Sequence, residues 1–184
     1  DDQGEKRFLL FDLFFRGGRA EHDGLAVADQ GRAVGLPADL ADLDLDDPIG
    51  TRTDPAIDLI KQQIRDFYKE GFELGLHLHP QWYNARHENG KWVLDYNEYS
   101  LCTLPQERIV QIINCSIAYL QKALDEPDFI PLSFRAGNWL FQPSEPAASV
   151  LADKGIKIDS SIFKGGLQHQ HNLDYRRALR NGYY

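Results

Sequence analysis

The chain has 184 residues, of which 42% are hydrophobic and 26% are charged, a length and composition typical of a globular protein with one core. Its formal net charge is −8, and no block of Lys and Arg offers a track for phosphates, which argues against nucleic acid as a partner. No apolar run approaches the ~20 residues needed to cross a bilayer, so no membrane span is expected.

The first residues are polar and contain no secretory apolar core. The two cysteines, Cys102 and Cys115, show neither metal-binding spacing nor a disulfide framework. We therefore expect one domain over residues 1–184 and a cytoplasmic location. A secreted form whose signal peptide has been removed is the alternative.

The first two predicted elements are separated by a segment, residues 16–54, to which no strand or clear helix is assigned. Residues 7–11 form a short apolar run that ends at Asp12, which is typical of a buried strand. Within residues 16–54, the acidic stretch 38–47 has a period of nearly two but a poor strand propensity, so it is expected to be irregular or weakly helical. A helix then begins at Asp54 and Pro55, the N-cap and first helical residue, and ends at Gly71.

The segment 72–80 alternates strictly between apolar residues and the set Glu73, Gly75, His77 and His79. This period of two predicts a strand with one apolar face, closed by Pro80. A connection rich in Trp and Tyr follows over 81–103 and includes a turn at 87–90.

The rest of the chain continues the alternation of helices and strands. We expect a helix over 105–125, a strand over 130–134, a helix over 144–154 that stops at Gly155, and a strand over 156–158. Strand–helix–strand alternation favours a parallel α/β architecture.

Ionisable residues stand where the predicted strands end: Asp12, His77 with His79, Arg135 and Asp159. The carboxyl ends of parallel strands share one face of the fold, and enzymes of this class build their sites there. Four strands that deliver ionisable groups to one rim therefore indicate a functional site.

His77 and His79 are two residues apart on one strand, so both imidazoles project from the same face. Two imidazoles with a carboxylate suit a divalent metal, above all Zn²⁺. The other interpretation of this pair is two half-buried, hydrogen-bonded histidines at a polar strand end.

Asp12 is a candidate general base or third metal ligand, or simply a turn residue. Arg135 follows an apolar strand and is expected to pair with a carboxylate such as Asp12. Asp159 is a candidate catalytic residue, with the capping of Ser160 and Ser161 as the structural alternative.

Several segments together resemble the polysaccharide deacetylases, the NodB-homology group of carbohydrate esterase family 4. Residues 73–82 (ELGLHLHPQW) resemble the histidine motif of that family, and residues 134–139 (FRAGNW) resemble its arginine motif. Residues 151–161 are similar to the helix–strand unit that follows, and Phe11-Asp12 to the aspartate motif. The match is good over 54–163 and nearly absent over 16–53.

The resemblance implies a distorted (β/α) barrel, incomplete in this chain, that hydrolyses N-acetyl groups of a carbohydrate or another N-acylated small molecule. It implies a divalent metal, preferably Zn²⁺, held by His77, His79 and Asp12. Asp12 also matches the family's base, and Arg135 the residue that orients it. Trp82 and Trp139 are expected to bind the substrate.

The chain departs from the family pattern at two ligand positions. Leu13 stands where the family has a second Asp, and Gln81 stands where it has its second histidine, so His79 has to substitute. Asp23 is a further candidate ligand, and His169 and His171 are candidates for the late general acid.

Two other functions are open. One is an amidohydrolase-type or cyclic-amide hydrolase on a barrel, in which His-x-His also ends a strand. The other is a non-catalytic carbohydrate-binding protein, in which Trp82, Tyr83, Trp92, Tyr96 and Trp139 stack on sugars.

Overall fold

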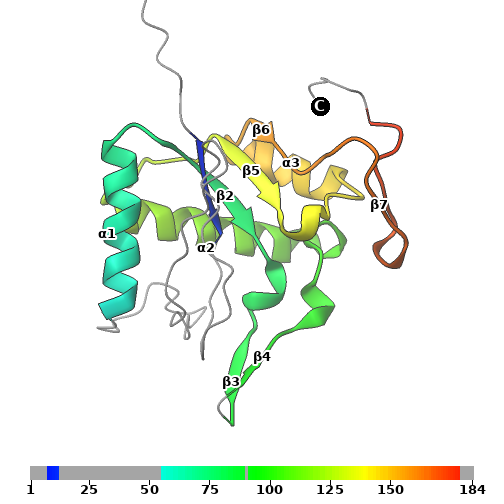
Figure 1. The fold of residues 1–184 in the computed structure, drawn as a ribbon, viewed down its shortest axis with the longest axis horizontal. Coiled ribbons are helices and arrows are strands. Elements are labelled where there is room, and N and C mark those ends of the chain that lie inside the picture. Colours follow the sequence, from blue (N-terminus) through cyan, green and yellow to red (C-terminus); the bar gives the residue numbers. More distant parts are fainter. Residues whose placement is uncertain (1–7, 13–54, 90, 179–184) are drawn as a thin grey trace, which may run out of the picture.

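The computed structural model of the chain describes residues 8–12, 55–89 and 91–178. Its central feature is a four-stranded parallel sheet with the strand order β1-β2-β5-β6 (Figure 1). These strands are β1 (Phe8–Asp12), β2 (Glu73–Leu78), β5 (Ser133–Ala136) and β6 (Ile158–Asp159). The expectation for residues 16–54 lies outside the described residues.

Each strand of this sheet pairs with the previous strand of the same sheet, so the strand order across the sheet follows the chain. A sequential parallel order is also that of a (β/α) barrel, whose strands follow one another around the axis. In the part of the chain that the structure describes, the four strands form an open sheet and do not close. The distorted barrel therefore stays a prediction.

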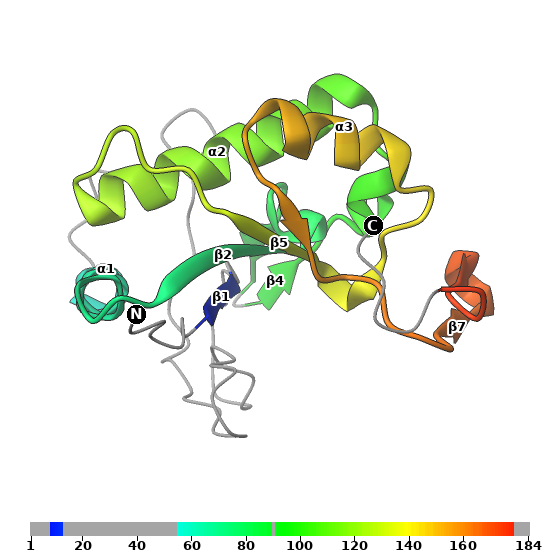
Figure 2. The same cartoon turned by 90° about the horizontal axis from the view of Figure 1, so that it is seen from above.

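Of the three α-helices in the described residues, two cover one face of the sheet. Figure 2 shows α2 (Gln106–Leu124) and α3 (Glu145–Asp153) on the same side, with α1 (Pro55–Lys69) beside the start of β2. The apolar residues of β2 and β5 pack with α2 in one buried cluster. Its most buried members include Leu74, Leu76, Leu78, Ile109, Ile112, Ile113, Leu120 and Phe134.

The predicted glycine stops are present at the ends of α1 and α3. Gly71 has φ 84, and the next amide, that of Phe72, donates to the Phe67 carbonyl at 3.0 Å. Gly155 has φ 87 in the same arrangement after α3. This left-handed cap satisfies carbonyls that the helix leaves without partners, and glycine adopts it without the Cβ penalty.

The structure shifts two strand boundaries and adds two hairpins that the sequence pattern did not predict. Arg135 and Asp159 lie inside β5 and β6, not after them. The expected turn at 87–90 joins β3 (Arg86–Glu88) to β4 (Lys91–Val93), and β7 (Leu167–Gln168) pairs with β8 (Leu173–Asp174). Short 3-10 turns connect these elements: η1 (Pro80–Trp82), η2 (Tyr96–Glu98), η3 (Leu101–Thr103), η4 (Gly137–Trp139) and η5 (His169–His171). Among the described helices, none has the length and apolarity that a membrane crossing requires.

Candidate metal site

The strand register places three of the sequence-predicted site residues in one row across the sheet. Asp12 of β1 is the partner of His77 of β2, and His77 is in turn the partner of Arg135 of β5. Paired residues of parallel strands lie on the same face of the sheet. The side chain of Asp12 lies outside the described residues, so only its position in this row is established.

The alternation of β2 puts this row on the face away from α2. Leu76 and Leu78, on either side of His77, are at most 1% exposed and belong to the core cluster. Because successive side chains of a strand point to opposite faces, His77 lies on the other face of the sheet. His79 follows it just past the strand end and is 7% exposed.

The backbone of β5 determines which nitrogen of His77 carries the proton. Nδ1 of His77 lies 3.0 Å from the carbonyl oxygen of Arg135. Because a carbonyl oxygen only accepts hydrogen bonds, Nδ1 is the donor and the lone pair of the neutral ring is on Nε2. A histidine held in this way by a carbonyl is the usual arrangement for a metal ligand.

The two histidines bring their Nε2 atoms to within 3.3 Å of each other. Two nitrogens bound to one tetrahedral Zn²⁺ at about 2.0–2.1 Å are themselves roughly 3.4 Å apart. The same separation also allows Nε2–H of His79 to donate to Nε2 of His77. Both arrangements need a lone pair on Nε2 of His77, and the spacing matches that of two ligands of one cation.

Burial keeps both imidazoles neutral. Removal from water lowers the pKa of His77, although the hydrogen bond to the Arg135 carbonyl opposes this change. It lowers the pKa of His79 to about 3, and the neighbouring His77 contributes in the same direction. The neutral ring is the form that binds metals.

The turn that follows β5 closes over His79. A Cβ on Gly137 would lie 2.7 Å from Cγ and Nδ1 of the His79 ring, so only glycine fits here without a shift. Asn138 and Trp139 come next with φ 55 and φ 56, a left-handed conformation that is strained for residues other than glycine. The hydroxyl of Tyr175 donates to the Trp139 carbonyl at 2.8 Å and holds this turn in place.

Arg135 and Asp159 are near each other, but each hydrogen-bonds the turn after β6. Nε of Arg135 donates to Oγ of Ser160 at 3.2 Å. The Asp159 carboxylate accepts from the Ser161 amide at 3.2 Å and from its hydroxyl, and Oγ of Ser161 accepts from the Ala136 amide at 2.7 Å. Asp159 therefore connects the end of β6 to the end of β5, and its register partner is Phe134, one residue from the His77 row.

Burial and the charge of the partner shift the pKa of each of these two residues in opposite directions. Burial raises the pKa of Asp159, while its hydrogen bonds from Ser161 and the charge of Arg135 lower it. Burial lowers the pKa of Arg135, and Asp159 opposes that change. The geometry favours the capping interpretation of Asp159.

The two tryptophans predicted to bind substrate have different surroundings. Trp82 on η1 is half-buried and packs against the core, with its ring 6.4 Å from that of Trp92. Trp139 on η4 is 47% exposed, and its ring meets that of Phe163 edge to face at 5.7 Å. Trp139 is thus accessible to a ligand, whereas Trp82 contributes mainly to packing.

Two of the candidate metal ligands, His77 and His79, lie in the described residues with their Nε2 atoms 3.3 Å apart. In the described residues, no group of three or more His, Cys, Asp and Glu side chains is placed to hold a metal. The predicted third ligands, the side chain of Asp12 and Asp23, lie outside those residues. Sequence reasoning also missed Gly137 and Ser161 as parts of the site, although both stand in segments that resemble the family's motifs.

No family model, curated protein or solved structure matches the chain. Its function is therefore inferred from the residues and geometry of this site.

Proposed function

We propose that the protein is a metal-dependent hydrolase that removes N-acetyl groups from a carbohydrate, as its resemblance to the polysaccharide deacetylases implies. The observation that carries this proposal is the His77–His79 pair, with Nε2 atoms 3.3 Å apart and the His77 tautomer set by the Arg135 carbonyl. His77 and His79 would hold the metal, with Asp12 as the third ligand.

Zn²⁺ is the metal that this donor set favours. Neutral imidazole is a preferred Zn²⁺ ligand, and a carboxylate at the Asp12 position would complete a set of three protein ligands with one position open. When bound, the metal supplies a Lewis acid that polarises the amide carbonyl of the substrate.

The remaining steps fall to side chains of the same row. Asp12, the register partner of His77, would take the proton from the attacking water. Arg135 pairs with His77 on the other side of β2, and its positive charge would favour the ionised form of that carboxylate. Asp12 thus has two candidate roles. Its substitution should weaken metal binding if it is a ligand and lower the reaction rate if it is the base.

The first test is metal content. Purified protein should bind close to one equivalent of Zn²⁺, and the double variant His77→Ala, His79→Ala should lose it while its circular dichroism is retained. His169→Ala is the matched control, because His169 is exposed on η5 and lies outside the pair. Unchanged zinc content in the double variant would exclude the proposed site.

The second test is activity. Zinc-loaded protein should release acetate from N-acetylated chito-oligosaccharides or peptidoglycan fragments, and a chelator should stop the release. Asp12→Asn should cost about 10²–10⁴ in rate with zinc retained if Asp12 is the base. It should weaken zinc binding itself if Asp12 is a ligand. Loaded protein that binds the saccharides but releases no acetate would favour the non-catalytic binding protein.

A further inference from the structure

The turn η4 has a backbone conformation that its own residues do not favour. Asn138 and Trp139 have φ 55 and φ 56, in the left-handed region where the Cβ of an L-residue is disfavoured. Two consecutive residues of this kind persist only where the surrounding structure holds them. Because Gly137 of the same turn lies against the His79 ring, relaxation of the turn would move the backbone that supports this histidine.

The hydroxyl group of Tyr175 lies at the end of this turn. It donates to the Trp139 carbonyl at 2.8 Å and accepts from the Phe141 amide at 3.0 Å. Burial raises the pKa of Tyr175 to about 12, so the hydroxyl keeps the proton that it donates. The Phe141 amide also lies 3.0 Å from the Trp139 carbonyl, so the hydroxyl joins both ends of a tight three-residue turn.

Tyr175 is itself fixed from several directions. Its carbonyl accepts from the Gly165 amide at 3.2 Å, and its ring meets that of Phe163 edge to face at 5.7 Å. The side chain is 3% exposed and packs with Leu140, which follows the turn, and with Leu173. The hydroxyl is therefore presented to the turn by a side chain that is packed in place.

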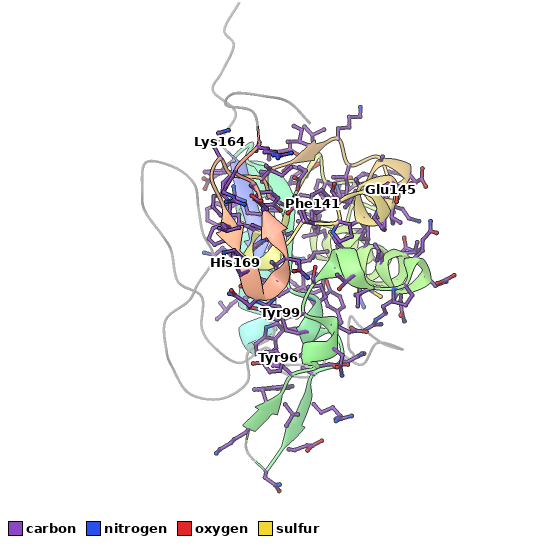
Figure 3. All side chains as sticks on the ribbon, turned by 90° about the vertical axis from the view of Figure 1, so that its right-hand side faces the viewer. Tyr96, Tyr99, Phe141, Glu145, Lys164 and His169 are labelled. Carbon is purple, nitrogen blue, oxygen red and sulfur yellow. The ribbon has the colours of Figure 1, made fainter. Side chains whose placement is uncertain are left out.

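The backbone on both sides of Tyr175 is anchored as well. The side-chain amide of Gln142 accepts from the Asp174 amide at 2.7 Å and donates to the Asp174 carbonyl at 3.3 Å. The ammonium group of Lys164, labelled in Figure 3, donates to the Arg176 carbonyl at 3.0 Å. Tyr175 thus has little freedom to follow the turn if the turn relaxes.

Apolar packing accounts for the ring of Tyr175 but not for its hydroxyl. A phenylalanine would fill nearly the same space, whereas a buried hydroxyl needs hydrogen-bond partners. Here both partners are backbone groups of the segment that begins beside His79. Tyr175 also lies after residue 163, beyond the segments that resemble the polysaccharide deacetylases, so the resemblance does not imply this contact.

We propose that Tyr175 is a positioning residue of the metal site: its hydroxyl keeps η4 in the left-handed conformation and thereby keeps Gly137 against His79. This inference rests on the proposed metal-dependent function. The hydroxyl acts through the backbone of the turn and not on the substrate. Its loss should loosen the ring of His79 and leave Nδ1 of His77, which the Arg135 carbonyl holds, unaffected.

The test is Tyr175→Phe in the full chain, which removes one oxygen atom and keeps the ring. In the metal-free protein, ¹H–¹⁵N spectra should show shifted ring resonances for His79 and an unchanged Nδ1 resonance for His77. Zinc affinity should fall by roughly 3- to 10-fold, below the ~10–100-fold that follows loss of a group in direct contact with a ligand.

A rescue variant separates positioning from a general loss of stability. Asn138→Gly places glycine at φ 55, a conformation that glycine adopts without external support. Added to Tyr175→Phe, it should restore most of the lost zinc affinity and return the His79 resonances toward those of the parent protein. A loss that glycine at this position does not reduce would contradict the proposed route through the turn.

Ser116→Ala is the matched control, because Ser116 on α2 also carries a buried hydroxyl with two partners, the Tyr83 hydroxyl and the Ile112 carbonyl. It should lower the free energy of unfolding and leave zinc affinity and the histidine spectra unchanged. Equal losses of zinc affinity in this variant and in Tyr175→Phe would overturn the positioning role, since affinity would then follow stability alone.

The remaining outcomes separate this inference from the proposed function. Zinc binding by the parent protein, with affinity and His79 resonances unchanged in Tyr175→Phe, would overturn the positioning role and leave the metal site standing. A parent protein that binds no zinc would exclude the metal site. A shift of the His79 resonances confined to Tyr175→Phe would in that case still support the hold of the hydroxyl on this ring.

Discussion

The backbone of Gly137 lies directly against the imidazole of His79. A Cβ on this glycine would be 2.7 Å from the ring atoms Cγ and Nδ1 and 2.6 Å from the carbonyl oxygen of Leu78. Real Cβ atoms do not approach other atoms so closely, so any larger residue must displace the ring or the strand end. The segment 133–139 therefore contacts both histidines: the Arg135 carbonyl of β5 holds His77, and Gly137 of the following turn η4 lies against His79.

Gly137→Ala should accordingly weaken zinc binding by roughly tenfold, because displacing a ligand from its supporting contacts typically costs 10–100-fold in metal affinity. Overpacking should also lower the free energy of unfolding by about 1–3 kcal/mol. Zinc titration followed by chemical unfolding measures both effects.

Gly166→Ala is the control for that variant, since its new Cβ would meet the Phe163 ring instead of a histidine. Its zinc affinity should equal that of the parent protein. Equal zinc affinities in both glycine variants and the parent would show that Gly137 does not position His79.

A second prediction concerns the protonation of His77 in the metal-free protein. The ring should be the tautomer with hydrogen on Nδ1, because its partner, the Arg135 carbonyl, only accepts. Long-range ¹H–¹⁵N correlation spectra of the histidines report which nitrogen is protonated. Addition of Zn²⁺ should then shift the Nε2 resonances of both His77 and His79, and a proton on Nε2 of His77 would contradict the proposed geometry.

A third prediction separates a structural role of Asp159 from a catalytic one. Its carboxylate holds Ser161, which in turn accepts from the Ala136 amide. Asp159→Asn keeps one carbonyl oxygen for these bonds, so kcat should fall less than the ~10²–10⁴-fold that is typical of a lost general base. A loss within that range, with the fold intact, would restore Asp159 to the catalytic residues.

The pH dependence of stability provides a second readout for the same variant. Burial raises the pKa of Asp159 above the value in the unfolded chain, so the folded state binds more protons between the two values. The contribution of this group to stability is then present below the unfolded pKa and is lost as pH rises through the folded pKa. The free energy of unfolding of Asp159→Asn, relative to that of the parent protein, should therefore be higher at pH 7 than at pH 3.5.

Local patterns in the sequence were sufficient to predict the pairing of the two histidines and the ends of two helices. Strict alternation over 72–80 predicted that His77 and His79 share a face, because that property depends only on the period of a strand. The structure adds what alternation does not contain: the 3.3 Å between Nε2 atoms and the tautomer, which depends on a carbonyl 58 residues away. The ends of α1 and α3 at Gly71 and Gly155 could also be predicted from the neighbouring residues alone.

The boundaries of β5 and β6 depended instead on pairing between distant segments. The amides of Lys157 and Ile158 both donate to the Leu132 carbonyl, which sets where β6 begins and places Asp159 within the strand. The hairpins β3–β4 and β7–β8 consist of three- and two-residue strands, too short to show an alternation. The role of Tyr175, which fixes both Trp139 and Phe163, has no sequence signal because it arises from tertiary contacts alone.

The last prediction concerns Arg135, whose backbone and side chain have different tasks. The His77 ring is held by the carbonyl of residue 135, which every amino acid supplies, so Arg135→Ala should retain zinc affinity. The half-buried guanidinium donates to Ser160 and lies two strands from Asp12 in the same row, and its loss should lower kcat because a carboxylate base at Asp12 would lose a favourable positive charge. For the same reason, the acidic limb of the pH–rate profile should move to higher pH.

Two variants control this experiment. Ser160→Ala removes the hydrogen-bond partner of Nε and should cost only about 0.5–1.5 kcal/mol of stability, with a small change in kcat. Arg176→Ala removes an exposed guanidinium that pairs with Asp174 away from the sheet row and should leave the pH profile unmoved. If Arg135→Ala lost zinc as readily as activity, the side chain would be needed to build the metal site, and the division of tasks proposed for residue 135 would be wrong.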